Sequence, residues 1–150
     1  MVHVALTATD DDLLLLVRSW LDVLAVEDYE RVFNEIGYAM AYGREAQGIR
    51  RDIKNYRSLE FYPGISDFRV SDWRTAEGGN PKRAILIRRY EYMESLPIVM
   101  TIELDLPLNG RWSDLQISFV VSLPTPHDSE GVLWLEDIAC PRQFQESADA

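Results

Sequence analysis

The hydrophobic period of the chain changes near residue 67, from about 3.6 residues to about two. Before this point, apolar side chains recur three and four residues apart, which is the spacing of one face of a helix. After it, apolar and polar residues alternate, as in strands of a sheet with one buried and one wet face. This order predicts a helical first half followed by an antiparallel sheet, the α+β class.

Three helices are predicted in the first half. The first begins after Thr9 or Asp10, because either side chain can cap a helix N-terminus. The second begins at Glu27 or Asp28, and the third spans residues 44–57. Their apolar stripes are expected to face one common core.

The second half predicts five strands that form an antiparallel meander. Their ranges are Phe68–Thr75, about Arg83–Met93, 100–106, 115–123 and Val132–Ala139. Asn109-Gly110 is the strongest turn signal, because both residue types accept the left-handed backbone angles of a tight hairpin. The helices are expected to cover the apolar face of a strongly curved sheet. Residues 1–140 then form a single domain, and the polar residues 141–150 form a flexible C-terminal tail.

Composition excludes several classes of function. The chain has 25 acidic and 15 basic residues, and its net charge of −10 would repel a phosphate backbone. The longest segment without a formal charge, Leu115–His127, is shorter than the ~20 apolar residues that span a bilayer. The single cysteine, Cys140, cannot form an internal disulfide. We therefore expect a cytoplasmic protein that binds neither nucleic acid nor membrane.

The residues that usually carry catalysis do not form a recognisable pattern. His3 and His127 lie in segments expected to be loose or turn-rich, with no carboxylate at a spacing that would orient them. No histidine or cysteine pair has the spacing of metal ligands, and no glycine-rich loop opens a helix. The sequence predicts no catalytic residue, no metal and no cofactor.

The order of the elements and a few short sequence segments resemble those of a known superfamily. These segments are the helix containing Trp20, Asp72-Trp73-Arg74, Asn109-Gly110-Arg111-Trp112 and Leu135-Glu136-Asp137-Ile138. Over roughly Asp10–Cys140 the chain resembles the nuclear transport factor two-like (cystatin-related cone) superfamily. The resemblance implies a cone of three helices on a curved five-stranded meander. That superfamily includes isomerases, dehydratases, polyketide cyclases, transport adaptors and bacterial immunity proteins, so the fold leaves the function open.

Charge is distributed unevenly along the chain. Residues 1–43 contain eight acidic and two basic residues, residues 44–94 eight and eleven, and residues 95–150 nine and two. The last segment includes most of the predicted sheet. We therefore expect the polar face of this sheet to be acidic.

This acidic face is the predicted binding surface for a protein partner. It includes Trp134 and Glu136 if Leu133 and Leu135 point inward. The predicted contact residues are Glu103, Asp105, Trp112, Asp114, Gln116, Trp134 and Glu136. Carboxylates around an aromatic anchor favour a basic partner. The leading hypothesis is a non-enzymatic bacterial immunity protein that occludes a basic toxin domain. Two alternatives for this surface are an ordinary solvated sheet face, made acidic for solubility, and the contact face of a homodimer.

The alternative is a protein with a ligand pocket between helices and sheet. In enzymes of the superfamily that this chain resembles, such a cone pocket pairs a carboxylate or histidine base with a tyrosine or second acid. The residues expected to line it here are Tyr42, Asp72, Arg88, Tyr90 and Tyr92, with Asp72 as the base if it turns inward. This reading implies an isomerase, dehydratase or cyclase, or a carrier of a small apolar molecule.

Overall fold

The structure, a computed structural model, describes residues 1–39, 45–78 and 85–140. It contains three helices and a five-stranded antiparallel sheet, which confirms the predicted α+β class. The elements are β1 (His3–Ala5), α1 (Asp10–Ala25), α2 (Tyr29–Ile36), α3 (Gln47–Lys54), β2 (Ile85–Arg89), β3 (Ile98–Leu108), β4 (Arg111–Ser122) and β5 (Glu130–Ala139). The predicted tail at 141–150 lies outside the described residues.

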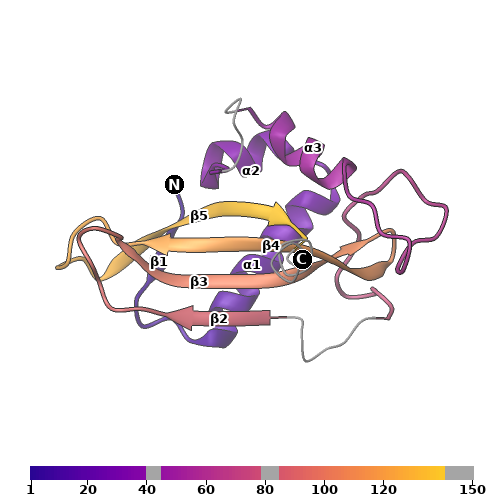
Figure 1. The fold of residues 1–150 in the computed structure, drawn as a ribbon. Coiled ribbons are helices and arrows are strands. Elements are labelled where there is room, and N and C mark those ends of the chain that lie inside the picture. The colour runs from indigo at the N-terminus through magenta and orange to yellow at the C-terminus, as the bar shows by residue number, and fades with distance from the viewer. Residues whose placement is uncertain (40–44, 79–84, 141–150) are drawn as a thin grey trace, which may run out of the picture.

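The sheet has the order β1-β5-β4-β3-β2, so β2 to β5 form a meander and β1 adds to its β5 edge. It is curled, and α1 crosses behind it, whereas α2 and α3 lie beyond the β5 edge (Figure 1). As a result, one face of β3, β4 and β5 packs against α1. No helix of the described ranges covers the opposite face.

Local signals in the sequence account for the start of α1. The Thr9 hydroxyl accepts a hydrogen bond from the Asp12 backbone N–H at 3.1 Å, and the Asp12 carboxylate accepts one from the Thr9 N–H at 3.0 Å. This capping box satisfies two N–H groups that a helix end leaves unpaired. None of the helices in the described ranges combines the length and the apolar character needed to cross a membrane.

The core lies between α1 and the sheet and extends under α2 and α3. From α1 it contains five side chains that are at most 5% exposed: Leu13, Val17, Trp20, Leu21 and Leu24. From the strands it contains the inward residues Ile102, Leu104, Ile117, Phe119, Leu133, Leu135 and Ile138. Burying each such side chain contributes about 1.5–3 kcal/mol, so this face of the sheet drives folding.

One predicted strand is wrong. Residues 68–75 are irregular, and Val70 makes only an isolated bridge to Leu108. The alternation there is real, because Phe68 and Val70 are buried, but the segment packs across the end of the sheet instead of joining it. The fifth strand is β1, in a region we expected to be loose.

The other elements match their predictions in position but not in length. The Asn109-Gly110 turn joins β3 to β4 with φ values of 51° and 85°, as expected. The second strand is shorter than predicted, because β2 ends at Arg89. The third helix is also shorter, since α3 ends at Lys54.

A tight contact between β5 and β4 gives a test of this packing. A Cβ added to Gly131 would overlap the Val121 side chain and lie 2.8 Å from the Ser122 carbonyl oxygen. Gly131→Ala should therefore lower the free energy of unfolding by about 1–3 kcal/mol. Ser129→Ala, in the exposed turn before β5, should change it by less than about 0.5 kcal/mol. Urea denaturation of both variants measures the difference, and equal stability would contradict this packing of β5.

Candidate functional site

The open face is the side of β3, β4 and β5 that points away from α1. Its rows are set by strand pairing: Glu103 lies opposite Ser118, which lies opposite Asp137. One row further along, Asp105 lies opposite Gln116. The structure thus brings the predicted residues Glu103, Asp105 and Gln116 together on one surface.

A β-bulge in β5 places two consecutive acids outside the core. Leu135 pairs with Phe119, whereas Asp137 pairs with Ser118, so Glu136 is an extra residue in the ladder. Leu135 and Ile138 are both buried, and the two acids between them are half-buried. Strict alternation from Leu135 would have turned Asp137 inward. The bulge instead keeps both carboxylates near the surface.

Trp134 is the exposed aromatic residue of this face, at 42% exposure. Its indole N–H donates a hydrogen bond to the Ser122 hydroxyl at 2.8 Å. The ring also lies against Gly37, where an added Cβ would be 3.5 Å from it. Gly37 ends α2 with φ of 66°, a conformation that favours glycine. The ring is therefore held in one position before any partner binds.

A groove of about 500 Å³ runs beside this ring. We call it the Trp134 groove. It lies between the end of α2 and the open face, and it is lined by Phe33, Gly37, Tyr38, Ala39, Ile98, Val120, Trp134, Leu135 and Glu136. Val120 is 7% exposed although it lies opposite Trp134 on the outer face of the sheet. The groove is thus an apolar site outside the main core.

Three carboxylates lie next to the groove, and we call Glu103, Glu136 and Asp137 the carboxylate cluster. Desolvation, followed by the charges of Asp137 and Glu103, raises the pKa of Glu136. Desolvation is also the main cause of the raised pKa of Asp137, to which Asp52 contributes. Within residues 1–39, 45–78 and 85–140, none of the three forms an ion pair. The cluster is a site of net repulsion that a cation would relieve.

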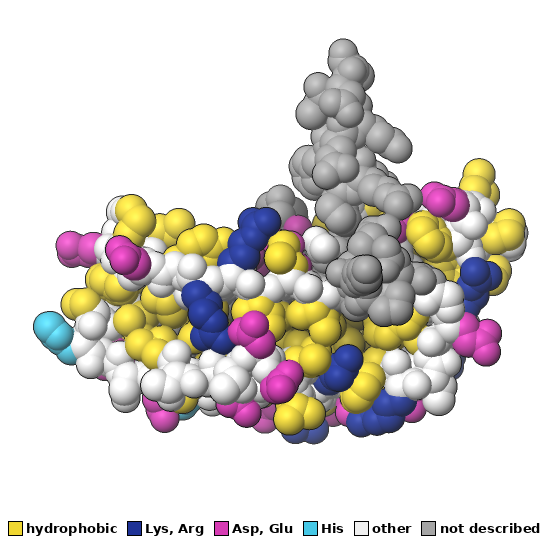
Figure 2. All heavy atoms as spheres, turned by 90° about the horizontal axis from the view of Figure 1, so that it is seen from below, with side chains coloured by type: hydrophobic (Ala, Val, Ile, Leu, Met, Phe, Trp, Pro, Cys, Tyr) yellow, Lys and Arg dark blue, Asp and Glu magenta, His cyan; other side chains and the backbone are white. Residues whose placement is uncertain are grey.

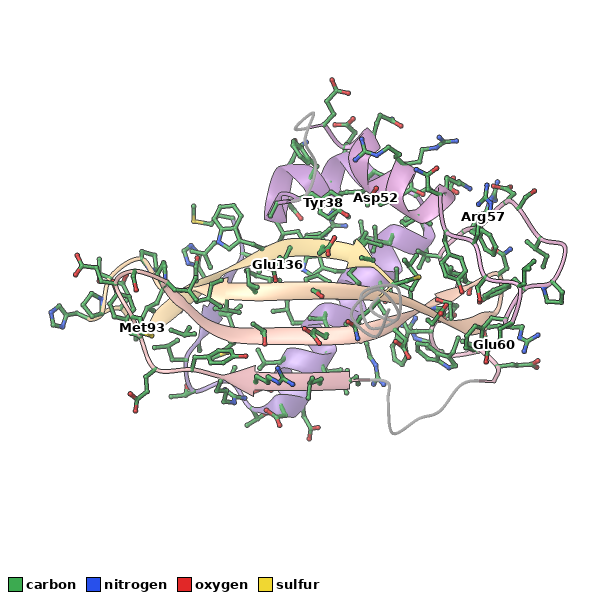
Figure 3. All side chains as sticks on the ribbon, in the orientation of Figure 1. Tyr38, Asp52, Arg57, Glu60, Met93 and Glu136 are labelled. Atoms are coloured by element: carbon green, nitrogen blue, oxygen red, sulfur yellow. The ribbon has the colours of Figure 1, made fainter. Side chains whose placement is uncertain are left out.

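A buried tyrosine joins the groove to α3. The Tyr38 hydroxyl donates to the Asp52 carboxylate at 2.7 Å and accepts from the Ile138 N–H at 3.2 Å. Burial and this carboxylate raise the pKa of Tyr38 strongly. Figure 3 shows Tyr38 and Asp52 above the strand that carries Glu136. These bonds fix the wall of the groove to β5, and sequence spacing gave no sign of them.

Two predicted contact residues lie away from the groove. Asp114 is buried at 9% exposure, and its carboxylate accepts a hydrogen bond from the Tyr56 hydroxyl. It therefore cannot steer a partner as we expected. Trp112 lies near the start of β4, where its backbone N–H donates to the Glu77 carbonyl oxygen at 2.9 Å. Its side chain is half-buried.

The residues of the predicted pocket do not converge. Asp72 is on the surface with Arg74, whose guanidinium also binds Asp22 of α1. The Asp72 carboxylate accepts hydrogen bonds from the backbone N–H and the side chain of Arg74, which lower the pKa of Asp72. A general base in a desolvated pocket needs a raised pKa, so Asp72 does not suit this role. Arg88 lies on β2 opposite Thr101 of β3, so it shares the outward face of the sheet but stands at the edge away from β5. Tyr42 lies outside the described residues.

The remaining predicted residues belong to the β2 edge. Figure 2 views the molecule from that side, where hydrophobic, basic and acidic side chains are interspersed. Tyr90 is 48% exposed there, and Tyr92 is half-buried against the core. The β2 edge thus carries acidic, basic and apolar side chains together. The carboxylate cluster is separate from it, because its members lie on β3 and β5.

A metal site does not explain the carboxylate cluster. In the part of the chain that the structure describes, no group of three or more His, Cys, Asp or Glu side chains is placed to hold a metal ion.

Comparisons of the chain with family models, curated proteins and solved structures found no match. The function must therefore be argued from the geometry of the open face and the groove.

The raised pKa of Glu136 predicts how stability depends on pH. Because its pKa in the folded state lies above the unfolded value, the ionised carboxylate opposes folding at neutral pH. Glu136→Gln should therefore raise the midpoint of thermal unfolding at neutral pH. The gain should disappear below pH 4.5, the ordinary pKa of glutamate, because the wild-type carboxyl is then protonated in both states.

Asp12 supplies the control of opposite sign. Hydrogen bonds from Thr9 lower the pKa of Asp12, so its ionised form favours folding. Asp12→Asn should therefore lower the midpoint at neutral pH. A decrease for both variants would contradict the electrostatic reading of Glu136.

Proposed function

We propose that this protein is a non-enzymatic binding module, most like a bacterial immunity protein that neutralises a toxin by occluding it. The partner docks on the open face with a basic surface. Glu103, Glu136 and Asp137 steer it, and Trp134 is the anchor at the centre of the contact.

The observation that carries this proposal is a carboxylate cluster with no ion pair among the described residues, beside an ordered, exposed tryptophan. Acidic residues that form no ion pair within the described part of the chain attract a cationic surface over long range and increase the association rate. A tryptophan already fixed by Ser122 and Gly37 loses little conformational entropy on binding. Rings of this kind are frequent hot spots of protein interfaces.

The size of the protein is compatible with this role. Its accessible surface is 8975 Å², and a standard interface covers about 800 Å² on each partner. An interface of that size would use about a tenth of the accessible surface. Nuclease and other active sites that bind anionic substrates are basic, which makes them suitable targets for an acidic inhibitor.

The alternative, an isomerase-like or ligand-carrying pocket protein, has weaker support. Its proposed base, Asp72, is exposed and paired with Arg74. The space between α1 and the sheet is filled by side chains such as Phe119 and Leu21, both at most 1% exposed. A turnover assay that responds to one interior carboxylate would favour this alternative.

Co-expression tests the proposal. The chain should relieve the toxicity of the product of the neighbouring gene and copurify with it. The double variant Glu103→Lys/Glu136→Lys should abolish rescue and slow association at low salt at least tenfold. Trp134→Ala should weaken binding about 30-fold, mainly by faster dissociation. Binding kinetics at two salt concentrations measure both effects.

The matched control is Glu30→Lys/Glu94→Lys, which makes the same change in net charge at two exposed residues outside the open face. It should retain rescue. If both double variants act alike, net charge alone explains the effect and the open face is excluded. If the wild-type chain neither rescues nor copurifies, but forms a dimer that Glu103→Lys disrupts, then this face joins two copies instead.

A further inference from the structure

We propose that the Trp134 groove receives a lysine side chain of the partner, with its stem along Trp134 and Val120 and its ammonium group beside Glu136. This inference rests on the proposed function, because the lysine belongs to the protein docked on the open face. It assigns the groove a definite chemistry: a primary alkylammonium group.

The lining of the groove matches the stem of such a side chain. Apart from Glu136, the described residues that line it carry no charge. Its volume of about 500 Å³ accommodates a four-carbon chain in contact with the indole and Val120. Lysine stems lie along apolar surfaces in this way while the charged end stays near water.

The charge at the end of the groove matches the ammonium group. Glu136 lines the groove, and the charges of Asp137 and Glu103 act on its carboxylate. Strand spacing places Glu103 about 10 Å from Asp137 between backbones, in the row next to that of Val120 and Trp134, which line the groove. An arriving ammonium group would reduce the repulsion among three carboxylates that form no ion pair within the described residues.

Lysine fits better than arginine. A guanidinium group carries five N–H donors in a rigid plane, and most of them would find no acceptor among the apolar residues of the groove. An ammonium group has three donors on a compact centre, which Glu136 and water at the entrance can satisfy.

The test uses n-butylammonium, which reproduces the lysine side chain, and follows the indole N–H signals by NMR. The chain has four tryptophans, and the loss of one signal in Trp134→Phe assigns Trp134. Butylammonium should shift that signal saturably, with a Kd on the order of 10 mM. n-Butylguanidinium should bind at least threefold more weakly, and 1-butanol should give no saturable shift.

Two isosteric variants locate the charge. Glu136→Gln should weaken butylammonium binding at least threefold, whereas Glu94→Gln, in the exposed turn between β2 and β3, should leave it unchanged. The lysine assignment is overturned if no saturable shift occurs, if Glu136→Gln has no effect, or if the guanidinium binds as tightly as the ammonium. Both substitutions keep the size of the side chain, so both variants are expected to fold. The dispersion of signals in the same spectra checks this.

The butylammonium titration and the rescue experiment can fail independently of each other. If rescue depends on Glu103 and Trp134 while butylammonium does not bind, the interface stands and the lysine assignment fails. If butylammonium binds as expected but the neighbouring gene product is neither bound nor inhibited, the groove chemistry stands and the immunity function fails.

Discussion

The apolar inner face of β3, β4 and β5 must be removed from water, and α1 is the element that covers it. Leu13, Val17, Leu21 and Leu24 of this helix are essentially inaccessible to solvent against the sheet. Since α1 occupies one face, and α2 and α3 lie beyond the β5 edge, no helix of the described ranges covers the other face. The architecture that stabilises the fold therefore also creates the open face.

The second constraint acts at the junction of α2, α3 and β5. Tyr38 bonds to Asp52 of α3 and to the Ile138 backbone, and the Ala39 N–H donates to the Leu135 carbonyl oxygen at 3.0 Å. The chain after α2 is thereby fixed along β5, and the Trp134 groove forms between them. Burial raises the pKa of Glu136 and of Asp137, so their ionised forms oppose folding and the core must compensate for them. Repulsion of this kind is frequent where a surface is shaped for binding, because a charged partner relieves it.

Several features could be predicted because they depend on neighbouring residues. The Thr9 cap, the Asn109-Gly110 turn and the inward direction of Leu133 and Leu135 all follow from local chemistry or from the period of a strand. The predicted strand at residues 68–75 was wrong for the same reason. Alternation there reports that Phe68 and Val70 are buried, but it does not say whether their backbone joins a ladder.

The candidate site could be predicted only in part. Glu103, Asp105 and Gln116 share a face because alternation fixes it within each strand. The position of Asp137 depends on a bulge that the pattern of β5 does not reveal, since the extra residue is defined only by pairing with β4. The burial of Asp114 depends on Tyr56, 58 residues earlier in the chain.

By itself, the sequence determined the class of fold, the strongly acidic net charge and which side of the central strands is polar. These properties follow from composition and from periods of two and 3.6 residues, which each segment carries independently of the others. Only the tertiary structure decided that Trp134 is fixed against Gly37 and Ser122, that a groove opens beside it, and that Glu136 lines this groove within reach of the charges of Glu103 and Asp137. Such features arise from contacts between distant segments, and a linear pattern does not encode the distances between them.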